Sequence, residues 1–451
     1  NFKKGNRLDE KNYRPISVLP VVSKEFERLM QNQMILFINK FLSPYLCGYR
    51  KGYSAQQALV SLIEKWKVTL DNKGYGGAVL MDLSKAFDTI NHELLIAKLH
   101  AYGFDKSSLR FLDSYLRNRF QRTKINDVTS SWSELIRGVP QGSVLGPILF
   151  NIYLNDLFYI NESTNVCNFA DDTTFHACDL DLSTLLIRLE HDSSLAIEWF
   201  DSNYMKLNED KCHLLVSGHK FESTWVKVGD STIWESKEQK LLGVQIDKQL
   251  KFDNHVYSLC KNAGKKLSAL ARLSAYLNQD QRKTLMTTFI ESQFNYSPLT
   301  WMFHGRKSNN RINHIHERAL RLVYNDDKSS FTELLNRNNS YCVHHKNIQF
   351  LAIELYKIKN NISTQIMSEL FPLRDNSFLL RNQTDFATST VNTSSYGISS
   401  LRFFGTKIWS EVPNNIKNSK SLNEFKSRIK KWTPICQCKL CKIYVKDVGY
   451  I

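Results

Sequence analysis

Asn168-Phe169-Ala170-Asp171-Asp172 is the stretch on which the interpretation of this chain rests, because it sets two adjacent carboxylates behind an apolar pair. The flanking segments 166–170 and 173–177 are short, apolar and β-prone, which predicts two strands with the acids at the turn between them. Adjacent carboxylates repel each other, and a cation between them removes that conflict. Aspartate is also common at hairpin turns for local reasons, so an ordinary turn stays open as the alternative.

A third acid, Asp82, ends an upstream apolar stretch, 76–83, that is typical of a buried strand. Such a strand holds the Cα of its last residue rigidly, which suits a metal ligand. Together with Asp171 and Asp172, this acid predicts a two-metal site and hence a nucleotide polymerase. Asp88 follows in the next turn, where it could instead cap the helix expected after it.

The composition describes a globular chain with an excess of positive charge. With 451 residues there is room for two or three domains. The net charge of +16 favours a polyanionic partner such as nucleic acid, although a merely basic soluble protein has the same property. Nine scattered cysteines favour a reduced, intracellular protein. No membrane span is expected, because polar residues interrupt the most apolar stretch, 144–160.

The residue patterns predict a mixture of helices and hairpins. Ser23 is expected to cap the first helix. Helices are expected at about 24–40, 55–72, 92–102, 107–119 and 182–203, hairpins at 122–136 and 231–246, and helical patterns at 255–323, 329–359 and 403–431. Residues 376–400 are rich in Ser, Thr and Asn, which is typical of a loop.

Basic and glycine-rich loops supply candidate ligand-binding residues. Arg14, Arg50 and Lys51 could hold phosphate, although a lone surface cation is more often only solvated. The segment 137–147 is punctuated by glycine and proline, so a ligand can approach its backbone closely, and Gln141 would present a planar amide there. An ordinary loop before an apolar core helix is the alternative.

Three thiols lie close together near the end of the chain, at Cys436, Cys438 and Cys441. A structural zinc site needs four ligands, and no further cysteine or histidine follows. No zinc ion is therefore expected in this tail.

The order of these blocks resembles the serial motifs of reverse transcriptases, in particular those of non-LTR retrotransposons (LINE elements) of the jockey-like group. The blocks that carry the resemblance lie at 12–17, 48–52, Asp82 with 85–88, 140–147, 169–172, 207–211 and 242–244. Each block alone is a weak signal, whereas seven in order at these spacings are a specific one. The match covers about the first 250 residues, and the helical stretch that follows resembles a thumb.

The resemblance implies an α+β, right-hand polymerase fold. Its expected parts are fingers at 1–77, a palm with an antiparallel sheet at 78–250 that carries an inserted helix and hairpin at 103–136, and a helical thumb at 251–330. A mainly helical C-terminal region of uncertain role, 331–432, and a cysteine-containing tail, 433–451, complete the chain.

The resemblance also implies roles for single residues. Asp82, Asp171 and Asp172, with the Leu83 carbonyl, would hold two Mg²⁺ ions, for which Mn²⁺ could substitute, and Lys211 would protonate the leaving group. The nucleotide-contacting set would be Arg14 at the triphosphate, Gln141 and Gly142 in the pocket wall, and Phe87 against the sugar, with Arg50 as a further candidate. The turn 242–244 would grip the primer end.

The expected activity is that of an RNA-directed DNA polymerase acting on an RNA template, a DNA primer or nicked target DNA, and dNTPs. An RNA-templated RNA polymerase and an inactive nucleic-acid-binding relic of the element are the alternatives. The intact acids disfavour the relic, and Phe87 favours DNA synthesis. The chain starts with Asn and is expected to be a fragment that lacks an upstream endonuclease, working in the nucleus and cytoplasm.

Overall fold

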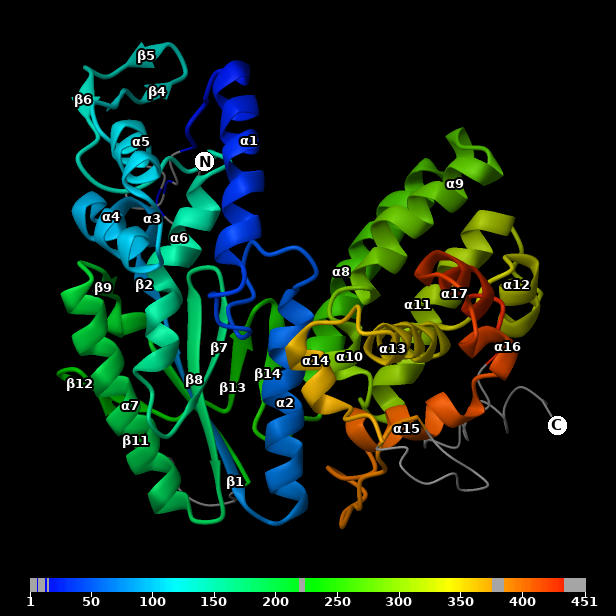
Figure 1. The fold of residues 1–451 in the computed structure, drawn as a ribbon. Coiled ribbons are helices and arrows are strands. Elements are labelled where there is room, and N and C mark those ends of the chain that lie inside the picture. The colour runs from blue at the N-terminus through cyan, green and yellow to red at the C-terminus, as the bar shows by residue number, and fades with distance from the viewer. Residues whose placement is uncertain (1–5, 7–12, 14–15, 219–223, 375–384, 434–451) are drawn as a thin grey trace.

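A four-stranded antiparallel sheet with helices on both faces forms the centre of the molecule (Figure 1). The computed structural model describes residues 6, 13, 16–218, 224–374 and 385–433. The strand order is β10-β1-β8-β7, and every neighbouring pair is antiparallel. The strands are β1 (Tyr75–Met81), β7 (Asn165–Phe169), β8 (Asp172–Asp179) and β10 (His213–Ser217). The expected mixed α+β class and antiparallel sheet are confirmed.

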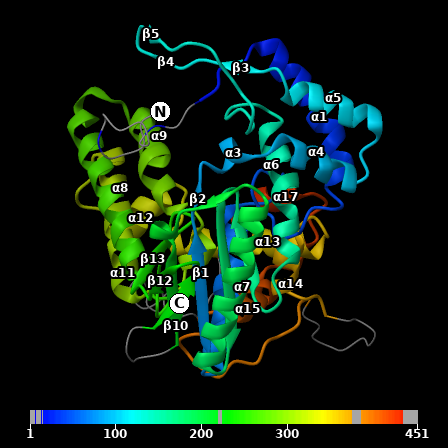
Figure 2. The same cartoon turned by 90° about the vertical axis from the view of Figure 1, so that its left-hand side faces the viewer.

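Both faces of β1 are buried, which explains its uninterrupted apolar sequence. Ala78 and Leu80 pack in the core beneath α2 (Ala55–Asp71), whereas Val79 and Met81 pack on the other side with α7 (Leu182–Ser202). Successive side chains of a strand point to opposite faces, so one strand serves both layers. Figure 2 shows α7 lying along its face of the sheet.

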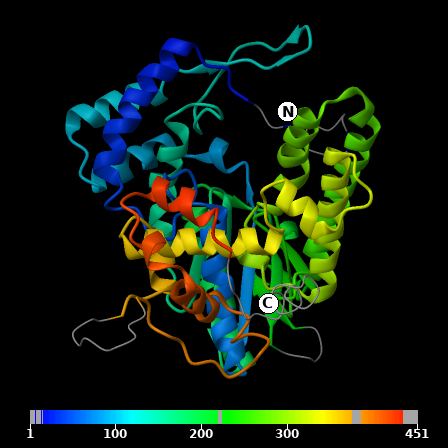
Figure 3. The ribbon, with the colours of Figure 1, turned by 90° about the vertical axis from the view of Figure 1, so that its right-hand side faces the viewer.

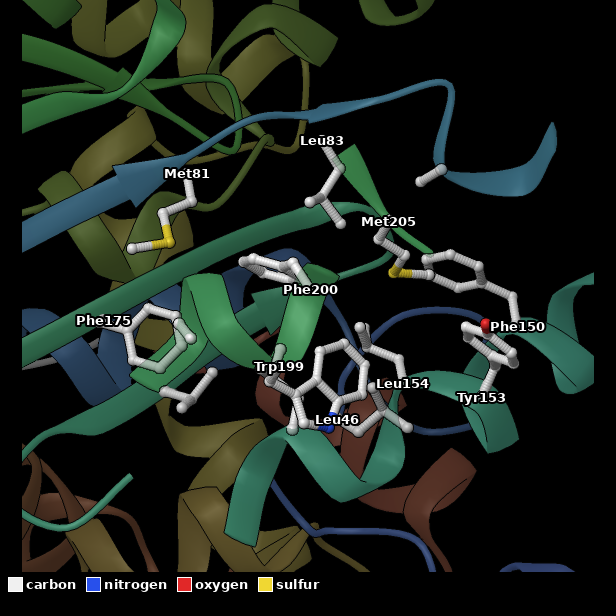
Figure 4. Close-up of a cluster of buried hydrophobic side chains, with 14 of the residues drawn as sticks. Leu46, Met81, Leu83, Phe150, Tyr153, Leu154, Phe175, Trp199, Phe200 and Met205 are labelled. Carbon is white, nitrogen blue, oxygen red and sulfur yellow. The ribbon is translucent and has the colours of Figure 1, made fainter. Parts of the chain in front are cut away.

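A second group of helices stands above one end of the sheet. It comprises α1 (Val21–Ile38), α3 (Ala86–Thr89), α4 (His92–Ala101), α5 (Lys106–Leu116) and α6 (Gly146–Leu154). Figure 4 shows where these helices meet the sheet core: Phe150 and Tyr153 of α6 lie beside Met205, and Leu83 points toward the same cluster. The apolar core is therefore continuous from the sheet into the upper helices.

Glu27 ties α1 to this group. Its carboxylate is 2% exposed and accepts hydrogen bonds from the backbone N–H groups of Val144 and Leu145, at 2.6 and 3.2 Å, where α6 begins. The Tyr115 hydroxyl of α5 donates to its other oxygen at 2.9 Å. A carboxylate at a helix N-terminus satisfies otherwise unpaired N–H groups and complements the positive end of the helix dipole.

Short hairpins extend from the central sheet. The hairpins are β3 (Phe120–Gln121) with β6 (Ser133–Glu134), β4 (Lys124–Ile125) with β5 (Val128–Thr129), β11 (Trp225–Val228) with β12 (Ser231–Trp234), and β13 (Glu238–Leu241) with β14 (Val244–Asp247). A further two-stranded ladder joins β2 (Leu83–Ser84) to β9 (Lys206–Leu207), which are distant in sequence. The expected hairpin at 122–136 is present. The single hairpin expected at 231–246 is wrong, because Gly229 and Gly243 take positive φ and close two separate hairpins.

The second half of the described chain is helical. It comprises α8 (Asp253–Leu273), α9 (Gln279–Leu285), α10 (Pro298–Trp301), α11 (Arg306–Tyr324), α12 (Phe331–Arg337), α13 (Val343–Lys359), α14 (Gln365–Leu370), α15 (Leu401–Glu411), α16 (Asn414–Lys417) and α17 (Leu422–Ile429). The helix expected at 329–359 is two helices, because Asn339 takes a positive φ between them. Residues 385–400 form neither helix nor strand, as expected.

The C-terminal helices pack against the rest of the molecule rather than apart from it (Figure 3). Their core includes Val60 of α2. Asp71 at the end of α2 accepts hydrogen bonds from the backbone of Asn392 and Thr393 and lies 3.4 Å from the Arg402 guanidinium. The buried Lys67 donates to the Ser399 carbonyl at 2.7 Å. Region 331–432 thus braces the outer side of α2.

Two smaller expectations are settled by this fold. Ser23 does not cap the first helix: Pro20, with φ −56° and an extended ψ, precedes it, so α1 begins at Val21. Among the residues that the structure describes, no helix is long and apolar enough to cross a membrane.

Replacing Glu27 with Ala is expected to destabilise the fold by about 2 kcal/mol, because two helix-terminal N–H groups and a buried hydroxyl lose their acceptor. Thermal and urea unfolding measure the loss. Glu25→Ala on the same helix is the matched control, since its pair with Arg28 is exposed and such pairs contribute about 0–1 kcal/mol. Equal effects of the two substitutions would contradict the assigned role of Glu27.

Candidate active site

The turn between β7 and β8 carries the adjacent acids, as the sequence predicts. Phe169 pairs with Asp172, which leaves Ala170 and Asp171 as the two residues of the turn. Ala170 takes a left-handed backbone conformation with φ +59°. Asp171 is half-buried and Asp172 is exposed, so both carboxylates lie at the end of the sheet where solvent can reach them.

Asp82 lies at the same end of the sheet. β1 ends at Met81, whose partner on β8 is Thr173. Because the strands are antiparallel, the next residue toward the end of the sheet is Asp82 after β1 and Asp172 on β8. The carbonyl of Asp82 accepts a hydrogen bond from the Asn208 N–H at 2.9 Å, which fixes the backbone where it leaves the strand. The antiparallel register therefore brings together acids that are 90 residues apart in sequence.

Lys211 reaches this group from the segment before β10. Its Nζ lies 3.0 Å from Oδ2 of Asp82, and the two side chains are 61% and 40% exposed. A solvent-exposed pair of this kind is weak, and either partner can exchange it for another charge. The residue pattern placed Lys211 before a strand, and the resemblance gave it the protonation of the leaving group. The fold adds that its ammonium contacts an acid of the candidate site.

The donor chemistry of this site suits a hard cation. Carboxylate oxygens are the ligands that Mg²⁺ prefers. In the conformations seen, no three acidic, histidine or cysteine side chains of the described residues are gathered tightly enough to hold an ion. The Asp82 carboxylate is turned toward Lys211 instead. The acids therefore suit a Mg²⁺ site by their backbone positions and by their ligand type. An ion that binds Asp82 must displace Lys211.

Leu83 follows Asp82 and pairs with Leu207 in the short β2–β9 ladder. Its side chain is 6% exposed and packs in the core. The strand pairing and the buried side chain of Leu83 restrict the backbone beside Asp82. They therefore also fix the Leu83 carbonyl, which the resemblance implies is a metal ligand.

Phe87 lies half-buried at the start of the upper helices. Its ring stacks on Phe150 at 4.5 Å between centroids, with 11° between planes, and meets the edge of Tyr49 at 5.8 Å. The ring is therefore held on two sides by other aromatic rings. Tyr49, which has φ +56°, was not singled out from the sequence, although it lies within the glycine-flanked loop.

Gln141 and Gly142 lie beside this aromatic group. The Gln141 side-chain amide donates to the Asp88 carboxylate at 3.0 Å, and the Gln141 backbone carbonyl accepts from the Ser17 N–H at 2.8 Å. A Cβ on Gly142 would lie 2.8 Å from the Ser17 carbonyl oxygen, and φ there is +119°. Asp88 does not cap α4; that helix is capped by the Asn91 side chain.

Arg50 is engaged by its own loop. Its guanidinium donates to the carbonyls of Ser43 and Leu46 and to the side chain of Asn39, and it stacks 4.3 Å over Tyr53. Partial burial lowers the pKa of this guanidinium. Arg14 and Cys436, Cys438 and Cys441 lie outside the described residues.

Tyr296 connects the helical half to the turn 242–244 and was not predicted as a site residue. Its hydroxyl donates to the Leu242 carbonyl at 2.7 Å, and its ring packs on Gly243 in the turn between β13 and β14. Burial raises the pKa of Tyr296, and the negative charge of Asp172 raises it further. The ring and hydroxyl of Tyr296 thus fix the turn 242–244.

Several curated proteins are similar to this chain. It is 24% identical over 281 residues to the RNA-directed DNA polymerase from mobile element jockey of Drosophila melanogaster, covering 60% of this chain and 31% of that protein. It is 26% identical over 331 residues to the probable RNA-directed DNA polymerase from transposon BS of the same fly, covering 69% and 36%. The chain thus spans about a third of the length of these relatives.

A solved structure, that of apo telomerase from Candida tropicalis truncated from its C-terminal domain, matches 50% of this chain and 44% of that chain at 13% identity and a TM-score of 0.36. That likeness is too low to support a conclusion. The pattern of the family described as reverse transcriptase (RNA-dependent DNA polymerase) matches residues 2–246, which include all three acids. Because this match covers more than half of the sequence, the chain belongs to the reverse transcriptase family.

Proposed function

We propose that this chain is the RNA-directed DNA polymerase part of a non-LTR mobile element, in which Asp82, Asp171 and Asp172 form the catalytic site. The observation that carries the proposal is the β1–β8 register, which sets Asp82 and Asp172 side by side at one exposed end of the sheet, next to Asp171. Similarity to the jockey and BS polymerases supports the choice of element. Members of this family generally use divalent metal ions.

In this proposal the parts follow the right-hand arrangement. Residues 1–77 are fingers, 78–250 the palm with the helix and hairpin of 103–136, and 251–330 the thumb. The four-stranded sheet forms the floor of the palm, α1 and its neighbours stand over one end of it, and α8 to α11 stand beside it (Figure 1). A primed template would lie between the two helical groups, above the acids.

Two Mg²⁺ ions, when bound, would activate a primer 3′-hydroxyl and stabilise the charge of the leaving pyrophosphate. Asp82, Asp171, Asp172 and the Leu83 carbonyl would hold them. Lys211, which now contacts Asp82, would leave it for this task, and its released ammonium would donate a proton to the pyrophosphate. The Leu242–Val244 turn, fixed by Tyr296, would hold the primer end.

The nucleotide would lie between the acids and the aromatic group. Arg14 would bind its triphosphate, and Gln141 and Gly142 would line the pocket. Phe87 would lie under the sugar, where its ring is supported by Phe150 and Tyr49 and cannot easily move away. Arg50, whose donors are turned to carbonyls of its own loop, contributes by fixing the loop that carries Tyr49, and a direct phosphate contact would require those bonds to open.

Asp171→Asn is expected to abolish extension of oligo(dT) on poly(rA) with Mg²⁺, while template binding stays within about twofold, because binding rests on many phosphate contacts and chemistry on the metal ligands. Extension and filter binding measure the two effects. Asp230→Asn, at an exposed turn of the β11–β12 hairpin, makes the same charge change away from the site. Near-normal extension by the Asp171 variant would refute the assignment. Extension of an RNA primer with ribonucleotides alone would identify an RNA polymerase instead.

Phe87→Val is expected to preserve DNA synthesis and to raise the use of UTP relative to dTTP at least about tenfold. In this proposal the intact ring would overlap a ribose 2′-hydroxyl, and overpacking costs about 1–3 kcal/mol. Comparing kcat/KM for dTTP and UTP on poly(rA) tests this. Phe111→Val on α5, which removes a surface-exposed ring, should leave the ratio unchanged. An unchanged ratio in an active Phe87 variant would make this residue a packing residue only.

Binding of an RNA–DNA duplex should weaken steeply with salt, with log K falling by about 0.9 per log unit of salt for each phosphate neutralised. This salt dependence is expected because the chain carries a net charge of +16 and its binding to phosphates releases counterions. Titrations between roughly 50 and 200 mM salt give the slope. The double variant Lys261→Gln/Lys265→Gln on α8 should reduce it by about two units if both lysines meet phosphate. A flat dependence in the wild type would exclude a phosphate-binding role for the basic surface.

A further inference from the structure

The turn that carries Asp171 and Asp172 has a backbone conformation that needs support. Ala170 takes φ +59°, a left-handed conformation that residues with a Cβ adopt rarely. The two acids beside it repel each other, which also disfavours a fixed arrangement. Surrounding structure must therefore hold the turn.

Asn168 supports the turn from inside the hairpin. Its side chain is fully buried, and its Nδ2 lies 2.9 Å from the Ala170 carbonyl, 3.3 Å from the Asp172 carbonyl and 3.0 Å from the Thr173 hydroxyl. One amide group thus bonds the backbone on both sides of Asp171. Its Oδ1 has no hydrogen-bond partner, and burying an unpaired polar atom destabilises the fold. The stabilising contacts of this side chain are therefore those of Nδ2.

Gly48 supports the turn from outside. A Cβ at this position would lie 2.3 Å from the Ala170 nitrogen and 2.8 Å from its Cα, so the two backbones are in direct contact. Leu46, two residues earlier, forms a parallel bridge with Asn168. Only glycine allows the loop before α2 to lie this close to the turn.

Asn151 of α6 holds Gly48 in place. It is 1% exposed, and its Nδ2 donates to the Gly48 carbonyl at 2.8 Å. Asn151 lies one residue after Phe150, the ring on which Phe87 stacks. A chain of contacts therefore runs from the aromatic group through α6 and the Gly48 loop to the acids.

We propose that Asn168, Asn151 and Gly48 form a two-sided clamp that positions Asp171 and Asp172 for metal binding, an inference that rests on the proposed function. Asn168 and Asn151 are positioning residues: they hold the backbone of the turn and touch neither nucleotide nor metal. The clamp pre-organises two like charges, so the free energy of metal binding is not spent on ordering the turn.

The first experiment uses Asn168→Leu, which keeps the branching and the number of heavy atoms of the side chain and removes the donor. Mn²⁺ binding, followed by electron paramagnetic resonance without nucleotide, is expected to weaken about 10- to 100-fold, as for other residues that orient metal ligands. The kcat of extension should fall by up to about a hundredfold, the Mg²⁺ concentration for half-maximal rate should rise, and KM for dTTP should stay within about twofold.

Asn347→Leu is the matched control, because Asn347 is a buried asparagine on α13 whose Nδ2 has no hydrogen-bond partner. A role confined to stability predicts that the two variants differ only in melting temperature and bind Mn²⁺ as the wild type does at a temperature where both are folded. That result would overturn the clamp.

The second experiment tests the outer side. Gly48→Ala forces the loop and the turn apart and should weaken Mn²⁺ binding as Asn168→Leu does, and Asn151→Leu should have a smaller effect of the same kind. Gly264→Ala, where an added Cβ would lie 3.8 Å from its nearest neighbour, is the control. If Gly48→Ala does not fold, the Mn²⁺ affinity of Asn151→Leu tests whether the Gly48 loop helps to position the acids. Absence of extension in the wild type would refute the proposed function. An active wild type with unchanged Mn²⁺ binding in the clamp variants would refute only the clamp.

Discussion

The antiparallel pairing of β1 with β8 is the constraint on which the rest of the structure depends. Side chains alternate between the faces of a sheet, so a slip of one residue would turn every apolar side chain of β1 to the wrong layer. Here both layers are filled, by α2 on one face and α7 on the other. The register is fixed by packing, and with it the meeting of Asp82 and Asp172 at the end of the sheet.

Charge at that end is balanced without burying it. Three carboxylates lie where solvent reaches them, and one is paired with Lys211. An exposed ion pair contributes about 0–1 kcal/mol, so the lysine can yield Asp82 to a stronger cation at little cost. A buried pair at this position would resist such an exchange, because removing one partner from a buried pair is strongly destabilising.

The C-terminal region acts as a brace rather than as a separate module. Its apolar core includes Val60 of α2 and Leu299 of α10, and its loops are held by Asp71 and Lys67, which are both buried. Because α2 also covers one face of the sheet and follows the Gly48 loop, the brace supports the same layer that supports the acids. Loss of these contacts would leave the buried Asp71 carboxylate unpaired, whereas Lys67 would keep its ion pair with Glu64.

The sequence by itself determined which residues could do chemistry and much of the secondary structure. Apolar periodicity marked α2, α4 and α7, alternation and turn residues marked the hairpin at 169–172, and the ordered blocks marked the family. These signals are local, and each is carried by residues close together in the chain.

Only the tertiary structure decided what these residues contact. The placement of Lys211 on Asp82, of Arg50 on its own loop and of Tyr296 beside the Leu242 turn involves partners chosen by packing, which no spacing reveals. The split of 231–246 between two hairpins followed from backbone conformations at Gly229 and Gly243. The contacts of Gly48 with Ala170, 122 residues away, and of Asn168 across the turn are not visible in the sequence, because long-range contacts of that kind are set by the fold as a whole.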